Sequence, residues 1–254
     1  MDFKKQYLEA INNHNYNNLI NIIVKNLIYN FNYESICDFG TCLCDDSDSD
    51  VIIKLNKEDC EILGKKMLAY SYYNNPDIKN ALALQFVCLE RGNDFQTVQE
   101  MLNTAVLLNN CIVLNNIAYS QFKLGMLSES FKLQKSAIKI SNGNYKNILN
   151  YNLMIYDLYL NKNIENKYDW KKYREMLISD DIYDYESAMI LSIIFDDFNF
   201  VKDTKNFFEK TFSCEDTVKS IINQYLDKRL VPFEQTLKIL QPKTFYDKFI
   251  YLMD

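Results

Sequence analysis

The sequence contains very little glycine, proline and histidine, and each shortage disfavours a class of protein. Its 254 residues include 5 glycines and 3 prolines. Antiparallel sheets need many tight turns, and tight turns favour those two residues, so a protein built from sheets is disfavoured. The single histidine is His14, whereas serine and cysteine nucleophiles usually need a histidine as their base. Because His14 lies among asparagines in a predicted turn, we expect a surface residue and not a catalytic one.

The chain also lacks the segments that mark membrane proteins, secreted proteins and nucleotide-binding enzymes. No apolar run reaches the length of about 18 residues that can span a bilayer. Residues 1–6 do not resemble a signal peptide, and no glycine-rich phosphate loop occurs. We therefore expect a cytoplasmic protein that binds no membrane and needs no cofactor.

Positive charge is also scarce relative to negative charge. The net charge is −6, and the sequence pI is about 5.0. Binding to nucleic-acid phosphates needs clustered lysine and arginine, so direct nucleic-acid binding is disfavoured. Hydrophobic residues make up 48% of the chain, which is enough to bury a core.

The cysteines do not form a recognisable metal-binding motif. Three of the seven are Cys37, Cys42 and Cys44, and Cys60 follows further along. Zinc sites usually contain pairs of cysteines separated by two residues, and no such pair occurs here. We expect reduced thiols that behave as small hydrophobic side chains, and no bound metal.

An acidic stretch forms the clearest break in the pattern. Its aspartates are Asp45, Asp46, Asp48 and Asp50. Their alternation resembles the start of a calcium loop, but Val51 and Lys57 occupy the positions that need glycine and glutamate. The stretch is therefore predicted to be an exposed loop, which is a candidate contact for a basic partner.

Apolar residues recur at helical spacing through most of the remaining chain. The predicted helices cover residues 2–12, 16–30, 33–43, 58–74, 78–91, 95–109, two segments within 114–140, 147–160, 169–178, 186–197, 201–212, 214–226, 232–240 and 243–252. We predict N-terminal helices over 1–44, the acidic loop over 45–55 and a helical-repeat region over 56–254. These parts are expected to form one continuous all-α domain.

The clearest signal is a predicted helical hairpin, Leu114–Ile140, which turns at Gly125. Its repeat-like positions are Leu114, Ile117, Ala118, Gly125, Leu127, Ser130 and Ala137. This pattern resembles a tetratricopeptide repeat, in which two helices pair within about 34 residues. The pattern departs from the family at Gln121 and Gln134, where aromatic residues are usual.

A second, weaker hairpin is predicted around Gly92, upstream of Gly125 by nearly one repeat length. Gly92 follows Arg91, where we predict a left-handed helix cap. The resemblance implies a stack of hairpins, an α-solenoid whose concave groove binds peptides or helices. The alternative is an irregular helical bundle that contains one repeat-like hairpin.

Aromatic residues are too numerous for a single buried stripe, so some are expected on a binding surface. Trp170 and Tyr173 share a predicted helical face, and tryptophan is enriched at binding hot spots. A single tryptophan is nevertheless more typical of a core. With the four aspartates above, the candidate partner-binding residues are Tyr70, Tyr73, Gln121, Trp170 and Tyr173.

These observations favour a non-catalytic scaffold or regulator that binds a protein or peptide on a helical-repeat surface. One alternative is an inhibitor or immunity-type protein that masks a toxin or a nucleic-acid enzyme, with the acidic loop as its contact. A second alternative is an unfamiliar enzyme that uses carboxylates. Its candidate pairs, Asp180 with Asp181 and Asp196 with Asp197, are predicted to cap helices instead.

Overall fold

The computed structural model describes residues 5, 6, 9, 13, 22, 33–44, 57–162, 167–179, 184–212 and 215–245, without the side chains of residues 35, 42, 57, 59, 60 and 91. Over this part of the chain, the regular secondary structure is entirely helical, as predicted. The acidic stretch 45–50, His14, residues 180–181 and most of the predicted helices 2–12 and 16–30 lie outside it. The chain divides into two compact units, residues 1–109 (unit 1) and 110–254 (unit 2). The boundary falls inside the region that we predicted to be continuous.

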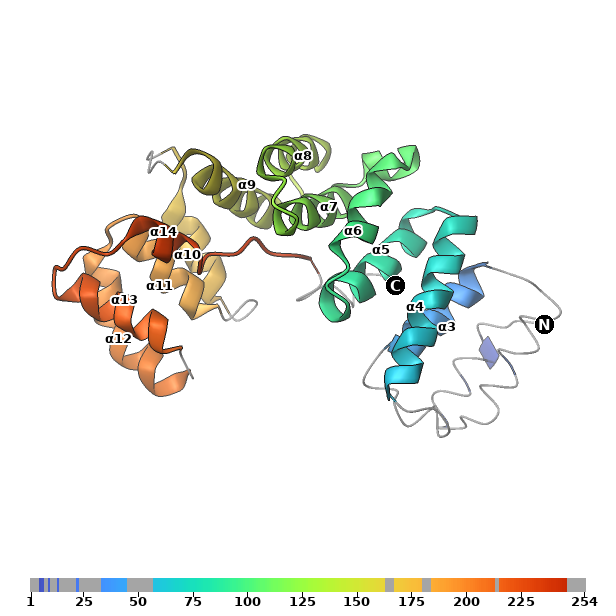
Figure 1. Cartoon of the computed structure of the whole chain (residues 1–254), viewed down its shortest axis with the longest axis horizontal. Helices are drawn as coiled ribbons and strands as arrows, with labels where there is room; N and C mark the ends of the chain where they lie inside the picture. The colour runs from blue at the N-terminus through green and yellow to red at the C-terminus, as the bar shows by residue number, and fades with distance from the viewer. Residues whose placement is uncertain are drawn as a thin grey trace. The chain divides into compact units, whose positions relative to one another are not determined.

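Within its described residues, unit 1 contains three longer helices followed by short helical segments (Figure 1). They are α3 (Tyr33–Cys44), α4 (Lys57–Asn74), α5 (Ile78–Phe86), the π-helical turn η2 (Val87–Arg91), α6 (Phe95–Glu100) and the 3-10 turns η3 (Met101–Asn103) and η4 (Ala105–Asn109). Helix α3 packs along α4. The two backbones approach closely at Gly64, where an added Cβ would lie 2.4 Å from the sulfur of Cys44.

The hairpin predicted around Gly92 differs from a regular repeat in two respects. Residues 95–109 do not form one helix, because the helix ends at Glu100 and Thr104 is extended. The Thr104 hydroxyl lies 2.8 Å from that of Tyr72, which holds this break against α4. The predicted cap at Gly92 is wrong as well: Gly92 is right-handed, and Asn93, with a φ of 45°, is the left-handed residue.

Unit 2 is a run of eight helices within its described residues (Figure 1). They are α7 (Cys111–Lys123), α8 (Leu127–Ile140), α9 (Lys146–Asn161), α10 (Trp170–Ile178), α11 (Tyr185–Ile194), α12 (Phe198–Thr211), α13 (Asp216–Leu226) and α14 (Phe233–Leu237). Helix α8 packs against both α7 and α9, and α11 packs against α10, α12, α13 and α14.

The helical hairpin Leu114–Ile140 is confirmed as the α7–α8 pair. Gly125 lies between the helices with a φ of 80°, a left-handed conformation that glycine adopts without strain. Ala118, Ser130 and Ala137 are fully buried, as expected for close packing of two helices. The helices elsewhere differ in length and in their links, and their arrangement as a tetratricopeptide-like solenoid remains a proposal.

Aspartate and asparagine side chains begin many of the described helices. N-terminal capping residues whose side chain accepts a backbone hydrogen bond are Asp77, Asp94, Asn110, Asp169, Asp184 and Asp197. Asp197 thus has the capping role predicted for it, since its carboxylate accepts a hydrogen bond from the amide of Phe200 at 3.2 Å. Helix α11 forms the centre of the main core of unit 2, because residues 187–194 are all buried.

Candidate functional site

After α14 the chain returns along α9 and α7 as an irregular segment, Gln241–Phe245, drawn in red in Figure 1. We call it the return segment. A helix was predicted to begin after Pro242, but Lys243, Thr244 and Phe245 are not helical. The main chain here makes hydrogen bonds with side chains of the neighbouring helices, so it does not need the bonds that a helix would supply.

Asn152 of α9 binds the main chain of Lys243 through both ends of its carboxamide. The Lys243 amide donates to Asn152 Oδ1 at 2.7 Å, and Asn152 Nδ2 donates to the Lys243 carbonyl oxygen at 2.7 Å. Asn152 is fully buried, so both bonds are shielded from water. This is the paired donor and acceptor pattern that one residue of a neighbouring β-strand would present.

Two further buried carboxamides support Asn152. Asn115 of α7 donates to the Lys243 carbonyl oxygen at 3.2 Å and accepts a bond from Asn152 Nδ2 at 2.8 Å. Gln134 of α8 donates to Asn115 Oδ1 at 3.0 Å and to the carbonyl oxygen of Leu149 at 2.9 Å. Asn115, Gln134 and Asn152, here called the carboxamide cluster, are all fully buried. The cluster therefore holds Asn152 in the orientation that the return segment requires.

Two tyrosines of α9 extend this recognition along the main chain. The Tyr151 hydroxyl donates to the Gln241 carbonyl oxygen at 3.1 Å. The Tyr159 hydroxyl donates to the carbonyl oxygens of Leu237 at 2.9 Å and Leu240 at 3.2 Å. Burial raises the pKa of Tyr159 and raises that of Tyr151 well above its ordinary value, so both hydroxyls stay protonated and can donate.

The side chain of Lys243 lies in an acidic environment at the start of α11. Its ammonium group forms an ion pair with Asp184, whose other carboxylate oxygen caps α11 by accepting a bond from the Ser187 amide at 2.9 Å. Burial raises the pKa of Glu186, and the carboxylates of Asp184 and Glu215 raise it further, while Lys243 opposes them. A positively charged side chain therefore suits the position of Lys243.

The side chain of Phe245 fills an apolar site beyond the carboxamide cluster. Phe245 is 1% exposed and packs with Leu114, Ala137 and Leu149 of α7, α8 and α9. The ring of Tyr145 meets it edge-on, with the ring centroids 5.0 Å apart. Unit 2 thus recognises three features of the return segment: the main chain at Lys243, a cation at the same residue, and an aromatic ring two residues later.

The predicted partner-binding residues are found in unit 1, in unit 2 and outside the described residues. The four aspartates of the acidic stretch lie outside the described residues. Gln121 is 2% exposed and Tyr173 is 8% exposed, so neither side chain is available at the surface of unit 2. Tyr70 and Tyr73 of α4 are 48% and 63% exposed, and they belong to unit 1.

Trp170 is half-buried and packs within unit 2, as expected for a single tryptophan. Its ring stacks on that of Phe195, with the centroids 5.5 Å apart and the planes at 5°. The guanidinium of Arg174 lies 5.4 Å from the Trp170 ring and bonds Asp197 at 2.6 Å. Trp170 therefore connects α10 with the helices that follow it.

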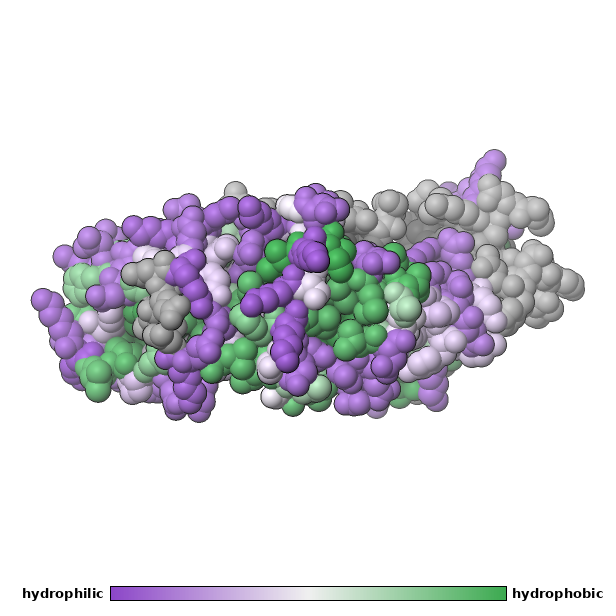
Figure 2. Space-filling model, turned by 90° about the horizontal axis from the view of Figure 1, so that it is seen from above, coloured by the Kyte–Doolittle hydropathy of each residue, from purple (hydrophilic) through white to green (hydrophobic). Residues whose placement is uncertain are grey.

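Unit 1 offers a smaller candidate site beside Tyr73. A pocket of about 160 Å³ is lined by Tyr72, Tyr73, Pro76, Thr97, Glu100, Met101 and Thr104. This is smaller than the pockets of about 300–1,000 Å³ that usually hold small ligands. The exposed hydrophobic residues of α4 include Ile62 and Leu63. Figure 2 shows one face of the molecule, on which hydrophobic residues (green) lie between hydrophilic ones (purple).

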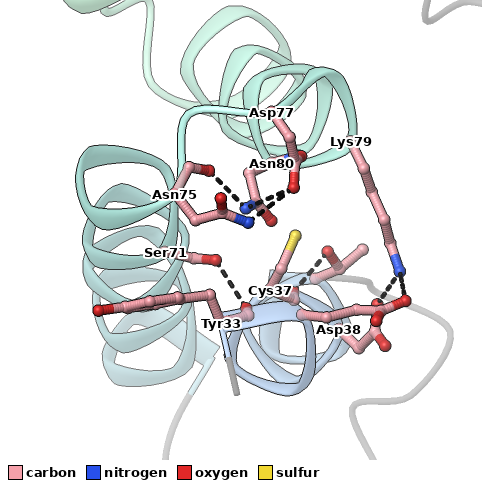
Figure 3. A network of polar contacts seen from close by, with 10 residues as sticks. Tyr33, Cys37, Asp38, Ser71, Asn75, Asp77, Lys79 and Asn80 are labelled. Atoms are coloured by element: carbon pink, nitrogen blue, oxygen red, sulfur yellow. Dashed lines mark hydrogen bonds and ion pairs between the residues drawn. The ribbon is translucent and has the colours of Figure 1, made fainter. Parts of the chain in front are cut away.

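A polar network in unit 1 has a structural role (Figure 3). The Ser71 hydroxyl donates to the Tyr33 carbonyl oxygen at 2.7 Å and connects α4 to α3. Lys79 of α5 pairs with Asp38 at 2.9 Å and with Glu34 at 3.2 Å. These contacts fasten the start of α5 to α3, and the ion pairs are exposed enough to contribute little each.

The buried cysteines have the character of hydrophobic residues. Burial, with the Asp38 carboxylate, raises the pKa of Cys37 to about 12. Burial also raises the pKa of Cys88 to about 12. Within the described part of the chain, no three His, Cys, Asp or Glu side chains gather where they could hold a metal ion.

Comparison with protein-family models, with curated proteins and with solved structures found no significant match to this chain. None of the described helices combines the length and the apolar character needed to cross a bilayer. The functional interpretation of the chain therefore depends on the contacts within its own structure.

Proposed function

We propose that the protein is a non-catalytic scaffold or regulator whose unit 2 binds an extended polypeptide segment of a partner. The observation that carries this proposal is the double hydrogen bond between the Asn152 carboxamide and the main chain of Lys243. A side chain that satisfies both the amide and the carbonyl of one residue recognises any extended chain of suitable shape. Recognition of this kind uses main-chain bonds for affinity and pockets for specificity, as in strand addition to a sheet edge.

The surroundings of Asn152 support a binding role over a purely structural one. Burying three carboxamides beside each other is costly unless their bonds are satisfied. A helical core could be completed with apolar residues at Asn115, Gln134 and Asn152, and such a core would need no partner for them. The protein instead retains polar groups here, and two of them, Asn115 and Asn152, make hydrogen bonds with the main chain of Lys243.

The proposal is tested on the full chain with Phe245→Ala, a change that loosens the return segment, by selecting binders from a display library of random linear peptides. The variants that follow are made in this chain. The variant Asn152→Leu, which keeps the branched side-chain shape but removes the carboxamide, serves for counter-selection. Asn150→Leu is the matched control, because Asn150 lies on the same helix and bonds only its own turn, at the Lys146 carbonyl oxygen.

We expect enriched peptides that bind the full chain and the Asn150→Leu variant but lose at least about tenfold in affinity on Asn152→Leu, a change of about 1.4 kcal/mol. Enrichment of no peptide contradicts the proposal. Peptides that bind the Asn152→Leu variant equally well place the binding elsewhere and also contradict it.

A further inference from the structure

We infer that the return segment is an intramolecular ligand of the peptide-binding surface, and that it is displaced by a partner segment with a lysine or arginine followed two residues later by an aromatic residue. This inference rests on the proposed function. It adds the chemistry of the partner segment and a competition that controls access to the surface.

The return segment can leave without removing the main core of unit 2. That core includes residues from α9 to α14 and ends at Leu240, so Gln241–Phe245 contributes no residue to it. Phe245 belongs to a smaller, separate cluster with Leu114, Ala137 and Leu149. The side chains of Tyr151, Asn115 and Asn152 bond the main chain of the segment, and another extended chain can make the same bonds.

Competition follows from the connection between the segment and the surface. Because the segment is tethered to α14, it binds as an intramolecular ligand at a high effective concentration, of the order of millimolar for a short flexible link. A free peptide must overcome this advantage, so the chain should bind weakly until the segment is loosened. A partner that presents several contacts at once would have the required affinity.

The three recognised features set the pattern of the partner segment. The carboxamide cluster fixes which residue lies beside Asp184, because Asn152 holds both main-chain groups of that residue. The acidic side chains of Asp184 and Glu186 select a cation there. In an extended chain, residues two apart lie on the same side, so the aromatic site occupied by Phe245 is reached two residues later.

The test uses a fluorescent, end-blocked peptide with the sequence of residues 240–245, Leu-Gln-Pro-Lys-Thr-Phe. It is titrated into the full chain and into two variants that loosen the return segment by different means, Phe245→Ala and Lys243→Glu. Two altered peptides carry Lys→Glu or Phe→Ala at the positions of Lys243 and Phe245. Circular dichroism and the fluorescence of Trp170 verify that each variant is folded.

We expect both loosened variants to bind the parent peptide at least about tenfold more tightly than the unsubstituted chain, and both altered peptides to bind at least about tenfold more weakly than the parent. Asp184→Asn should reduce the preference for Lys over Glu, because asparagine keeps the helix cap but removes the charge. Asp169→Asn, at the cap of α10, is its control and should leave that preference unchanged.

Equal affinity for the unsubstituted chain and both loosened variants overturns the competition. Indifference to the Lys→Glu and Phe→Ala peptides overturns the recognition pattern. If library peptides bind through Asn152 but this peptide does not, the inference fails and the proposed function stands. If no peptide binds, both fail. If the loosened variants form dimers that exchange return segments and bind no peptide, the surface binds a second copy of this chain, and this outcome contradicts the inference.

Discussion

Replacing Asn152 by leucine tests the energetic importance of the carboxamide cluster. Leucine has the branched shape and the heavy-atom count of asparagine and is somewhat larger, so the change removes hydrogen bonds without leaving a cavity. It leaves the part-buried Lys243 amide without its acceptor, which costs about 1–3 kcal/mol. The Lys243 carbonyl keeps its bond from Asn115, and Asn115 Oδ1 keeps its bond from Gln134, so each loses only one of two bonds.

Together these losses amount to about 2–6 kcal/mol of the stability of unit 2, with about 0.5–1.5 kcal/mol for each shared bond. The assay is urea unfolding followed by the fluorescence of Trp170, the single tryptophan, which lies in unit 2. At an m-value of about 2 kcal/mol per molar urea, the midpoint should fall by about 1–3 M.

Asn150→Leu provides the comparison, because its bond lies within one helical turn at the surface. Its effect should stay within about 0.5 kcal/mol, as for most surface substitutions. If Asn152→Leu lowers the midpoint no more than Asn150→Leu does, the carboxamide cluster does not hold the return segment, and the reasoning about this surface is wrong.

Three further predictions concern the conformation of a glycine, a buried carboxylate and the buried thiols. Gly125→Ala should destabilise the α7–α8 hairpin by about 1–2 kcal/mol in thermal unfolding, because its φ of 80° strains any other residue; Gly92→Ala, at a φ of −110°, should cost almost nothing. Burial acts to raise the pKa of Asp157, but hydrogen bonds from its neighbours lower it below the ordinary value of 3.8. The charged Asp157 carboxylate therefore stabilises the fold above pH 3.8, and this stabilisation is lost as the pH falls through the lowered pKa. The difference in unfolding free energy between the chain and Asp157→Asn, measured by urea unfolding, should shrink below pH 3.8. A constant difference would contradict this. In alkylation at pH 8 followed by mass spectrometry, Cys37 and Cys88 should remain unmodified in the folded chain, because a pKa of about 12 leaves almost no thiolate; rapid modification of either would show that its surroundings are open.

The helical class and most helix positions were predictable from the sequence, because the apolar period and the capping residues are local signals. The α7–α8 hairpin is the best example, since Gly125 and the small residues Ala118 and Ala137 mark its turn and its packed face. The helix predicted over 95–109 was wrong because its break depends on the contact between Thr104 and Tyr72, far apart in the sequence. Gly92 was also misassigned, because Asn93 takes the left-handed conformation there.

The candidate site was not predicted, and its key residues were missed. Asn115 and Asn152 lie in helices of an asparagine-rich chain, so their burial could not be distinguished from ordinary surface positions. The available signal was Gln134, which departs from the repeat pattern at a position that usually carries an aromatic residue. Its partners come from other helices and from the return segment, and their contacts depend on the tertiary fold.

The central claim is that unit 2 binds an extended main chain through Asn152. It is tested most directly by measuring the affinity of the peptide Leu-Gln-Pro-Lys-Thr-Phe for two variants of the full chain, Phe245→Ala and Phe245→Ala with Asn152→Leu. The account predicts binding to the first and a loss of at least about tenfold in the second. Equal affinity for both, or no binding to either folded variant, would contradict it.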